Sequence, residues 1–321
     1  MLLLAALTLV SRGAAPIVYR FDPAKYKFSV ESALGKVGYT EDLLALAKRT
    51  HAYAAINGCF FEAYVQGPIK PPDHSLIHEG QFVHGLEHDT AWGVDANGNM
   101  RIGRPDWQFE GTVTDRAGNS QAWYAYRINH PVTNPSVTIY TPAWGTETHA
   151  NTLQAQVTNG MVTWTGEYSL KIPANGFVIA FSDGERALAA RFQIGERVSY
   201  SIRPTGDEGK FWSSVVEMMG CGPWLVRDGK NVLDAESEGF TSPKVLSNSA
   251  LRSVVGISLK GELMLVVTSG TNAQVADQMV KLGATDAMGL DGGGSSGIVV
   301  NGKLLTRRGR AISNAIVVRR R

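Results

Sequence analysis

Short apolar stretches separated by turn-forming residues run through the sequence, and two segments instead repeat apolar residues with helical spacing. The pattern predicts a helix that begins after Thr40 as its N-cap, with Glu41 and Asp42 in its first turn and the basic Lys48 and Arg49 at its end. A second helix is expected over Ala273–Leu282, because Gly283 suits the position that follows a last helical turn.

Strands are expected on both sides of these helices, since short runs of β-branched and aromatic residues end at turn signals. The expected strands are residues 17–21, 27–30, 53–56, 92–94, 100–102, 253–259, 263–268, 298–300 and 315–318. Turns at Asp95–Gly98, Lys260–Gly261 and Asn301–Gly302 would join neighbouring strands into hairpins. Both ends of the chain therefore predict mixed α and β structure.

The middle of the chain, residues 106–205, lacks helix signals and alternates short apolar runs with turns such as Asn159–Gly160 and Asn175–Gly176. This pattern is typical of a small barrel or sandwich. We predict an α+β fold, in which residues 16–105 and 206–321 form a mixed-sheet core with flanking helices. An all-β insert at residues 106–205 would interrupt this core.

Charge and hydropathy narrow the classes of function. The 321 residues include 31 basic and 29 acidic side chains, so the net charge of +2 gives no argument for nucleic-acid binding. No apolar run reaches the ~20 residues that span a bilayer. Residues 2–10 are apolar and precede small residues, as in a signal peptide, although Arg12 lies on the wrong side. Residues 1–15 are a signal segment, a buried first strand or a misassigned start.

The strongest chemical motif is Leu-Asp-Gly-Gly-Gly-Ser-Ser at residues 290–296. Three successive glycines let backbone N–H groups converge on an anion, and serine hydroxyls add donors. The candidate ligand-binding residues are Gly292, Gly293, Gly294, Ser295 and Ser296. Asp291 stands at the rim of this loop and is the first candidate for a catalytic carboxylate. A structural glycine turn capped by Asp291 is the alternative.

A second motif is Ile-Asn-Gly-Cys-Phe-Phe at residues 56–61. The Asn57–Gly58 turn would follow a buried strand, and Asn57 offers a donor and an acceptor to sugar hydroxyls. Glu62 follows closely and is a candidate second carboxylate. An ordinary loop explains the same residues when they are taken alone.

Two more candidates come from the last third of the chain. In Met-Gly-Cys-Gly-Pro-Trp at residues 219–224, Gly222 allows a ligand to approach the backbone closely. Arg252 precedes an expected strand, where its guanidinium suits phosphate binding. A surface ion pair accounts for Arg252 equally well.

The two cysteines, Cys59 and Cys221, each stand beside a glycine in one of these motifs. They would form a disulfide if the fold brings the motifs together, and two small buried thiols are the alternative. Residues 74–89 hold four of the seven histidines, namely His74, His78, His84 and His88. Glycines break the helix that would align them on one ion, so no metal site is predicted there.

Taken together, the motifs resemble those of the phosphodiester glycosidase family. The family segments NGGFF, GGGPxLVxDG, RTAIG and LGAxxALNLDGGGSS correspond in order to INGCFF, MGCGPWLVRDG, LRSVVGISLKGELMLVV and KLGATDAMGLDGGGSSGIVVNGK. The agreement extends from about residue 40 through the ISNAIVV segment near the last residues. Residues 106–205 resemble the β insert of bacterial members.

Several positions depart from the family pattern. Cys59 and Cys221 replace residues that are more often glycine, which strengthens the expectation of a disulfide or paired thiols. Gly289 replaces an asparagine, Ser253 a threonine and Ser258 an aspartate. These replacements imply a change in substrate choice.

The resemblance implies hydrolysis of a glycosyl phosphodiester to a free sugar and a phosphomonoester. Arg252 and residues 292–296 would then contact the phosphate, Asp291 would be the catalytic carboxylate and Asn57 would orient a sugar hydroxyl. No cofactor is expected, with calcium held by Asp291 as the alternative.

Two other functions stay open: a phosphodiesterase that cleaves the P–O bond, and a non-catalytic cell-envelope module that binds polysaccharide. The expected partners are a glycosyl-phosphodiester or polysaccharide substrate, with no nucleic acid and no transmembrane span. The oligomeric state is not predicted. Family habit and the N-terminal segment together predict a secreted, periplasmic or cell-envelope location.

Overall fold

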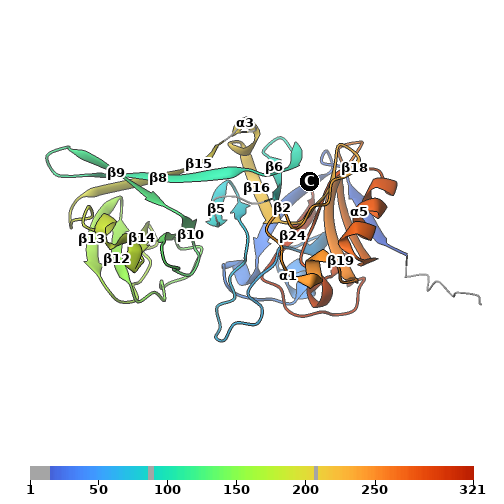
Figure 1. The fold of residues 1–321 in the computed structure, drawn as a ribbon, viewed down its shortest axis with the longest axis horizontal. Coiled ribbons are helices and arrows are strands. Elements are labelled where there is room, and N and C mark those ends of the chain that lie inside the picture. Colours follow the sequence, from blue (N-terminus) through green and yellow to red (C-terminus); the bar gives the residue numbers. More distant parts are fainter. Residues whose placement is uncertain (1–14, 86–89, 206–208) are drawn as a thin grey trace, which may run out of the picture.

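The computed structural model describes residues 15–85, 90–205 and 209–321, which form four β-sheets with a few short helices (Figure 1). The expected signal segment at residues 1–15 lies outside these ranges apart from its last residue. Strands hold far more of the described residues than helices do, so the fold is mostly β. No helix in the described ranges is long and apolar enough to cross a membrane.

A six-stranded sheet carries most of the last third of the chain. Its order is β1 (Ile17–Phe21), β20 (Leu263–Gly270), β19 (Ala250–Ser258), β21 (Ala284–Gly289), β17 (Trp224–Arg227) and β18 (Lys230–Asn231). The helix α5 (Asn272–Lys281) covers one face, where Val275 and Met279 pack on Val254 and Met264. Thr271 caps α5 through a capping box with Gln274, which confirms the predicted helix.

A five-stranded sheet, here the β24 sheet, interleaves both ends of the chain. Its order is β2 (Tyr26–Ser32), β24 (Asn314–Arg320), β3 (Ala54–Asn57), β22 (Ile298–Val300) and β23 (Lys303–Leu304). The helix α1 (Leu43–Arg49) packs Leu46 against it. Asp42, not Thr40, is the N-cap of α1, because a β-bridge between Glu41 and Ile312 keeps the chain extended up to Asp42.

A second five-stranded sheet, here the β16 sheet, contains β5 (Gln81–His84), β4 (Leu76–His78), β16 (Val215–Cys221), β6 (Thr90–Asp95) and β7 (Met100–Gly103), in that order. Side chains from this sheet, the β24 sheet and the six-stranded sheet meet in one hydrophobic cluster. Trp92, Ile316 and Val255 are fully buried members of it. This shared core fixes the relative positions of the loops that leave the three sheets.

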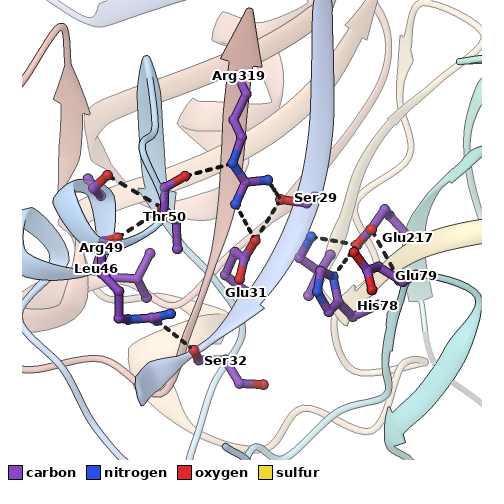
Figure 2. Close-up of polar contacts among 12 residues, drawn as sticks. Ser29, Glu31, Ser32, Leu46, Arg49, Thr50, His78, Glu79, Glu217 and Arg319 are labelled. Carbon is purple, nitrogen blue, oxygen red and sulfur yellow. Dashed lines mark hydrogen bonds and ion pairs between the residues drawn. The ribbon is translucent and has the colours of Figure 1, made fainter. Parts of the chain in front are cut away.

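Polar side chains join the β24 and β16 sheets along β2 (Figure 2). Glu217 of β16 accepts a hydrogen bond from the Val30 backbone N–H at 2.7 Å and contacts His78 Nδ1 at 3.1 Å. This contact with Glu217 raises the pKa of His78. Further along β2, Arg319 of β24 donates to the half-buried Glu31, so Glu31 of β2 and the buried Glu217 of β16 are both matched by hydrogen-bond donors.

The eight-stranded sheet occupies one end of the molecule (Figure 1). Its order is β10 (Arg127–Ile128), β11 (Val137–Tyr140), β14 (Gly176–Phe181), β12 (Leu153–Thr158), β13 (Met161–Gly166), β15 (Arg197–Thr205), β8 (Asp106–Thr114) and β9 (Ser120–Ala125). A short helical segment, η2 (Asp183–Glu185) and α2 (Arg186–Ala189), interrupts the stretch that was expected to be all-β. Leu188 and Phe192 anchor this segment in a hydrophobic cluster that the eight-stranded sheet shares with the β16 sheet.

Pairing in the three sheets outside residues 106–205 is antiparallel at every described neighbour, where a mixed-sheet core was expected. The remaining short helices are η1 (Ala33–Gly35), α3 (Gly209–Trp212), α4 (Pro243–Leu246) and η3 (Gly293–Ser295). The division of the chain into a core and an insert at residues 106–205 stays a prediction.

Candidate active site

A cavity of about 530 Å³ brings together loops from both halves of the chain. The loop after β3 supplies Phe60, Phe61, Ala63 and Tyr64, and the segment before β4 supplies Asp73 and His74. The other lining residues are Phe240, Ser242, Lys244, Val245, Asn248, Ser249, Ala250, Arg252, Asp291, Gly292, Gly293, Gly294 and Arg310. Two carboxylates, three cations and several aromatic rings therefore share one cavity.

Asn57 fixes the backbone of Asp291 and is itself fully buried. Its Nδ2 donates to the Asp291 carbonyl at 2.8 Å, while its Oδ1 accepts from Ser253 Oγ at 2.6 Å and from the Gly297 N–H at 3.0 Å. The Asp291 N–H in turn donates to the Gly58 carbonyl at 2.9 Å. Protein groups therefore occupy the polar atoms of Asn57, and its predicted contact with a sugar hydroxyl stays a prediction that this geometry does not favour. Asn57 is a positioning residue.

Position 58 needs a glycine because the Asn314 side chain lies against its backbone and leaves no room for a Cβ. A Cβ built on Gly58 would lie 1.9 Å from Asn314 Oδ1, which already accepts the Cys59 N–H at 2.8 Å. Gly58 is buried, so its role is in packing and not in ligand binding as predicted. Cys59 and Cys221 are both buried in the hydrophobic cluster shared by three sheets, and their disulfide stays a prediction.

Asp73 lines the cavity, although the sequence analysis did not single it out. Its N–H donates to the Phe60 carbonyl at 3.0 Å, which ties it to the loop after β3. Burial raises the pKa of Asp73 to about 6. The charge of His74 lowers that pKa, and those of Glu62 and Asp291 raise it further. Nothing in the local sequence separates Asp73 from other loop acids.

Glu62 was the predicted second carboxylate, but it is exposed and lies outside the lining of the cavity. Its charge still reaches Asp73. The difference arises because the chain turns at Phe61, which forms a β-bridge with Pro72 and brings Asp73 to the cavity instead. Asp73 thus stands where the sequence analysis expected Glu62.

Asp291 is the second carboxylate of the cavity. Burial raises its pKa above the usual value, while the Ser295 hydroxyl, the charge of Arg310 and the Gly292 N–H pull it back. The opposed effects leave Asp291 easier to ionise than a carboxyl that is only buried. Asp73 receives weaker compensation, so the two carboxyls are in different environments, as an acid and base pair requires.

Three cations line the cavity without a carboxylate within 4.0 Å in the described part of the chain: Lys244, Arg252 and Arg310. Arg252 is buried and donates to the carbonyls of Gly270, Lys244 and Asn248. Lys244 and Arg310 lie over the Tyr64 ring, at 5.6 and 5.2 Å from its centroid. Buried or clustered cations that lack an acidic partner favour an anionic ligand.

The glycine loop at residues 292–296 lines the cavity with its glycines, while its two serines are buried. Gly292, Gly293 and Gly294 line the cavity, whereas Ser295 and Ser296 are buried beneath it. Ser296 Oγ donates to the Leu251 carbonyl at 3.1 Å, so the structure does not support its predicted role in ligand binding. The Arg310 N–H donates to the Gly294 carbonyl at 2.8 Å, and this bond places Arg310 beside the loop.

Gly222 lies outside the lining of the cavity, against the prediction. A Cβ at this position would meet the Phe240 ring at 3.1 Å and Glu238 Oε2 at 3.2 Å, so the glycine makes room for the loop that carries Phe240. Glu238 anchors that loop, because it accepts hydrogen bonds from Thr90 Oγ1 and the Trp224 N–H. Gly222 thus acts on the cavity only through packing.

Aromatic rings form one wall of the cavity. The centroid of Phe60 lies 5.9 Å from both His74 and Phe240, and those of His74 and Phe240 are 6.4 Å apart. Aromatic side chains combine an apolar face with polar edges, which suits the apolar face of a sugar ring.

The histidine-rich stretch forms no metal centre within the described residues, where no group of three or more His, Cys, Asp or Glu side chains could hold an ion. His78 pairs with Glu217, and the ring of His84 contacts the His74 carbonyl at 2.8 Å. His88 lies outside the described residues. Calcium at Asp291 stays an untested alternative.

Known structures share the fold. A hypothetical protein from Synechocystis superposes with a TM-score of 0.82 and 24% identity over 95% of this chain, which spans 59% of the Synechocystis chain. A Burkholderia pseudomallei protein described as exported superposes with a TM-score of 0.76 and 20% identity, over 94% of this chain and 73% of its own. The catalytic domain of zebrafish N-acetylglucosamine-1-phosphodiester α-N-acetylglucosaminidase superposes with a TM-score of 0.49 and 14% identity, over 98% of this chain and 85% of its own. This superposition is too weak to support an argument.

A search of curated proteins finds no match. The sequence model of the phosphodiester glycosidase family matches residues 151–319, more than half of the chain. The matched range contains Lys244, Arg252, Asp291 and Arg310, whereas Asp73 precedes it. The match begins inside the stretch expected to be an insert, so its boundary does not coincide with the predicted one. The chain belongs to the phosphodiester glycosidase family.

Proposed function

We propose that this protein hydrolyses a glycosyl phosphodiester to a free sugar and a phosphomonoester, with Asp73 and Asp291 as the catalytic carboxylates. The observation that carries the proposal is their presence in one cavity with three cations that lack an acidic partner. Glycoside hydrolysis uses two carboxyl groups in different protonation states, and a phosphodiester supplies the anion for the cations.

The cavity accommodates the two parts of such a substrate on different walls. The phosphate would lie between Arg252, Lys244 and Arg310, near the backbone of Gly292. The sugar would stack on Phe60 and Phe240 and reach the carboxylates with its anomeric carbon. This arrangement places the C1–O bond between the acid pair and the cations.

The reaction follows from these positions. As the C1–O bond breaks, its electrons leave with the phosphate, whose negative charge the three cations stabilise. Ionised Asp291 stabilises the positive charge that develops at C1. Asp73, whose pKa is about 6, donates a proton to the leaving phosphate oxygen as the C1–O bond breaks and then accepts a proton from the attacking water. Water adds its hydroxyl to C1, and the phosphate leaves as a monoester.

The test is sugar release from a panel of sugar-1-phosphodiesters by wild type, Asp73→Asn and Asp291→Asn. Both variants should lose at least about 100-fold in kcat, in line with the loss of an acid–base or charge-stabilising group. Full activity in both variants would contradict the proposal. Exposed Glu62→Gln is the control for kcat, which should stay near the wild-type value because Glu62 does not line the cavity, although loss of its charge should lower the pKa of Asp73.

Hydrolysis in oxygen-18 water locates the broken bond. Label in the sugar is expected, whereas label in the phosphate would show P–O cleavage and make the enzyme a phosphodiesterase. A folded protein that binds polysaccharide but releases no product from any donor would support the envelope-binding alternative. We further propose an extracellular or cell-envelope glycan as the natural substrate and catalysis without a metal; full activity in EDTA is expected.

A further inference from the structure

A second cavity lies on the eight-stranded sheet. It measures about 680 Å³ and is lined mainly by β8, β9 and β15, with Tyr126 and Arg191 at its border. A neighbouring cavity of about 570 Å³ shares Thr112 and Ser199 with it. The two cavities form one groove across the strands. Figure 1 shows β8 and β9 toward the end of the molecule opposite β19, which carries Arg252.

Strand register gives this groove a polar floor. Tyr124 of β9 lies opposite Glu110 of β8, which lies opposite Ser201 of β15. Side chains at opposed positions of antiparallel strands point to the same face. The next row along this face is Ala122, Thr112 and Ser199. Alternate residues such as Trp123 and Phe109 are buried in the sheet's hydrophobic cluster, so the polar face is free for a ligand.

An exposed aromatic ring is held rigid at one side of the groove. Tyr124 is 43% exposed, and its hydroxyl donates to one oxygen of Glu185 at 2.9 Å. The Tyr126 hydroxyl donates to the other oxygen at 3.0 Å, and the two rings are 5.5 Å apart. One carboxylate thus fixes both rings, so little side-chain entropy remains to be lost when a ligand stacks on Tyr124.

The charges along the groove have one predominant sign. Arg191 and Arg203 line one part, and Arg197 lines the other. Glu110 is the one carboxylate among these lining residues, and it lies 3.5 Å from Arg203. Among the residues that the structure describes, Arg191 and Arg197 therefore have no carboxylate within 4.0 Å. A ligand with sugar rings and negative charges matches both the aromatic ring and the arginines.

We propose that this groove binds an extended anionic glycan, with a pyranose ring on Tyr124 and acidic groups facing Arg191 and Arg197. The two adjoining cavities, of about 680 and 570 Å³, give room for several sugar rings, which favours an oligosaccharide chain over a single sugar. The site is separate from the catalytic cavity, and its occupancy does not depend on the reaction proposed there. Carboxylate and phosphate groups on the glycan would be recognised by the same arginines.

Isothermal titration calorimetry with oligosaccharides tests the proposal and separates the two sources of charge. The probes are oligogalacturonates, which carry carboxylates, phosphomannan oligosaccharides, which carry phosphates, and neutral dextran oligosaccharides. Wild type should bind at least one anionic probe, and dextran at least about tenfold more weakly. Tyr124→Ala should weaken binding about fivefold to tenfold, the loss expected for one aromatic contact.

Tyr168→Ala is the matched control, because Tyr168 is 61% exposed but lies outside both parts of the groove. It should bind like wild type, and Tyr124→Ala should turn over a small sugar-1-phosphodiester at the wild-type rate. Arg197→Gln should reduce the dependence of affinity on salt. Absence of binding to both anionic probes, equal affinity for dextran, or equal losses in the two tyrosine variants would overturn the proposal.

Discussion

The charge of Asp291 acts on Asp73, although the two residues come from opposite halves of the chain. Both line one cavity, and the negative charge of Asp291 is among the causes that raise the pKa of Asp73 to about 6. The protonation of one carboxyl therefore depends on the charge of the other.

We expect kcat/KM to fall as pH rises through about 6, because the proposed acid form of Asp73 is then lost. A pH profile of kcat/KM from pH 4 to pH 8 measures this limb. In Asp291→Asn the charge that raises the pKa of Asp73 is absent. The kcat/KM of the residual activity should therefore fall at a lower pH than in wild type. A limb at the same pH in both proteins would contradict the coupling.

The same shift affects stability. The folded-state pKa of Asp73 lies above the ordinary aspartate pKa of 3.8, so its stabilising contribution is complete below about pH 3.8 and is lost as pH rises through about 6. Between pH 4 and pH 7, the free energy of unfolding of wild type should fall by about 2 to 3 kcal/mol relative to that of Asp73→Asn. Urea unfolding of both proteins at each pH measures the difference. A pH-independent difference would show that Asp73 titrates normally.

Asn57→Asp should lower kcat and leave KM nearly unchanged, because Asn57 positions Asp291 without touching the substrate. The lost donor and the buried charge should also destabilise the fold by about 3 kcal/mol. Ser253→Ala is the milder comparison, since it removes one hydroxyl bonded to Asn57 and leaves the bond to Asp291. Kinetics and urea unfolding measure both effects. A rise in KM with unchanged kcat would instead indicate that Asn57 contacts the sugar directly.

Lys244→Gln and Arg310→Gln should each raise KM for a phosphodiester about tenfold and weaken competitive inhibition by inorganic phosphate to a similar extent. Both cations line the cavity beside Tyr64, so removing one leaves the fold intact. Lys303→Gln changes an exposed lysine of β23 and should behave like wild type. Unchanged inhibition by phosphate in both cavity variants would place the anion elsewhere.

Local patterns predicted the elements that depend on neighbouring residues. The strand Ile17–Phe21, the hairpin around Gly261 and the helix beside Thr271 are confirmed because alternation, turn chemistry and capping act within a few residues. The N-cap of α1 was predicted at Thr40 but lies at Asp42, since the β-bridge from Glu41 to Ile312 is a long-range contact.

The site shows the same limit. The glycine loop and Asp291 were identified because their pattern is unusual in itself. The positioning contacts of Asn57 were not predicted, because its partners Ser253 and Gly297 lie far along the chain. Asp73 was missed, since its raised pKa comes from burial and from distant charges that no local pattern encodes. Family resemblance supplied the reaction class, which the residues alone left open.

The interleaving of the β24 sheet has a consequence for the biogenesis of the protein. β3, which delivers Asn57, lies between β22 and β24, and β2 pairs with β24 along its whole length from Tyr26 to Ser32. Such long-range pairing closes large loops and slows folding. During translation, the Asn57 loop and its strands must wait for β22 and β24 to emerge from the ribosome. The cavity that holds Asp73 and Asp291 is therefore assembled after translation of these last strands, and a nascent chain that stops before Asn314 should be inactive and dependent on chaperones.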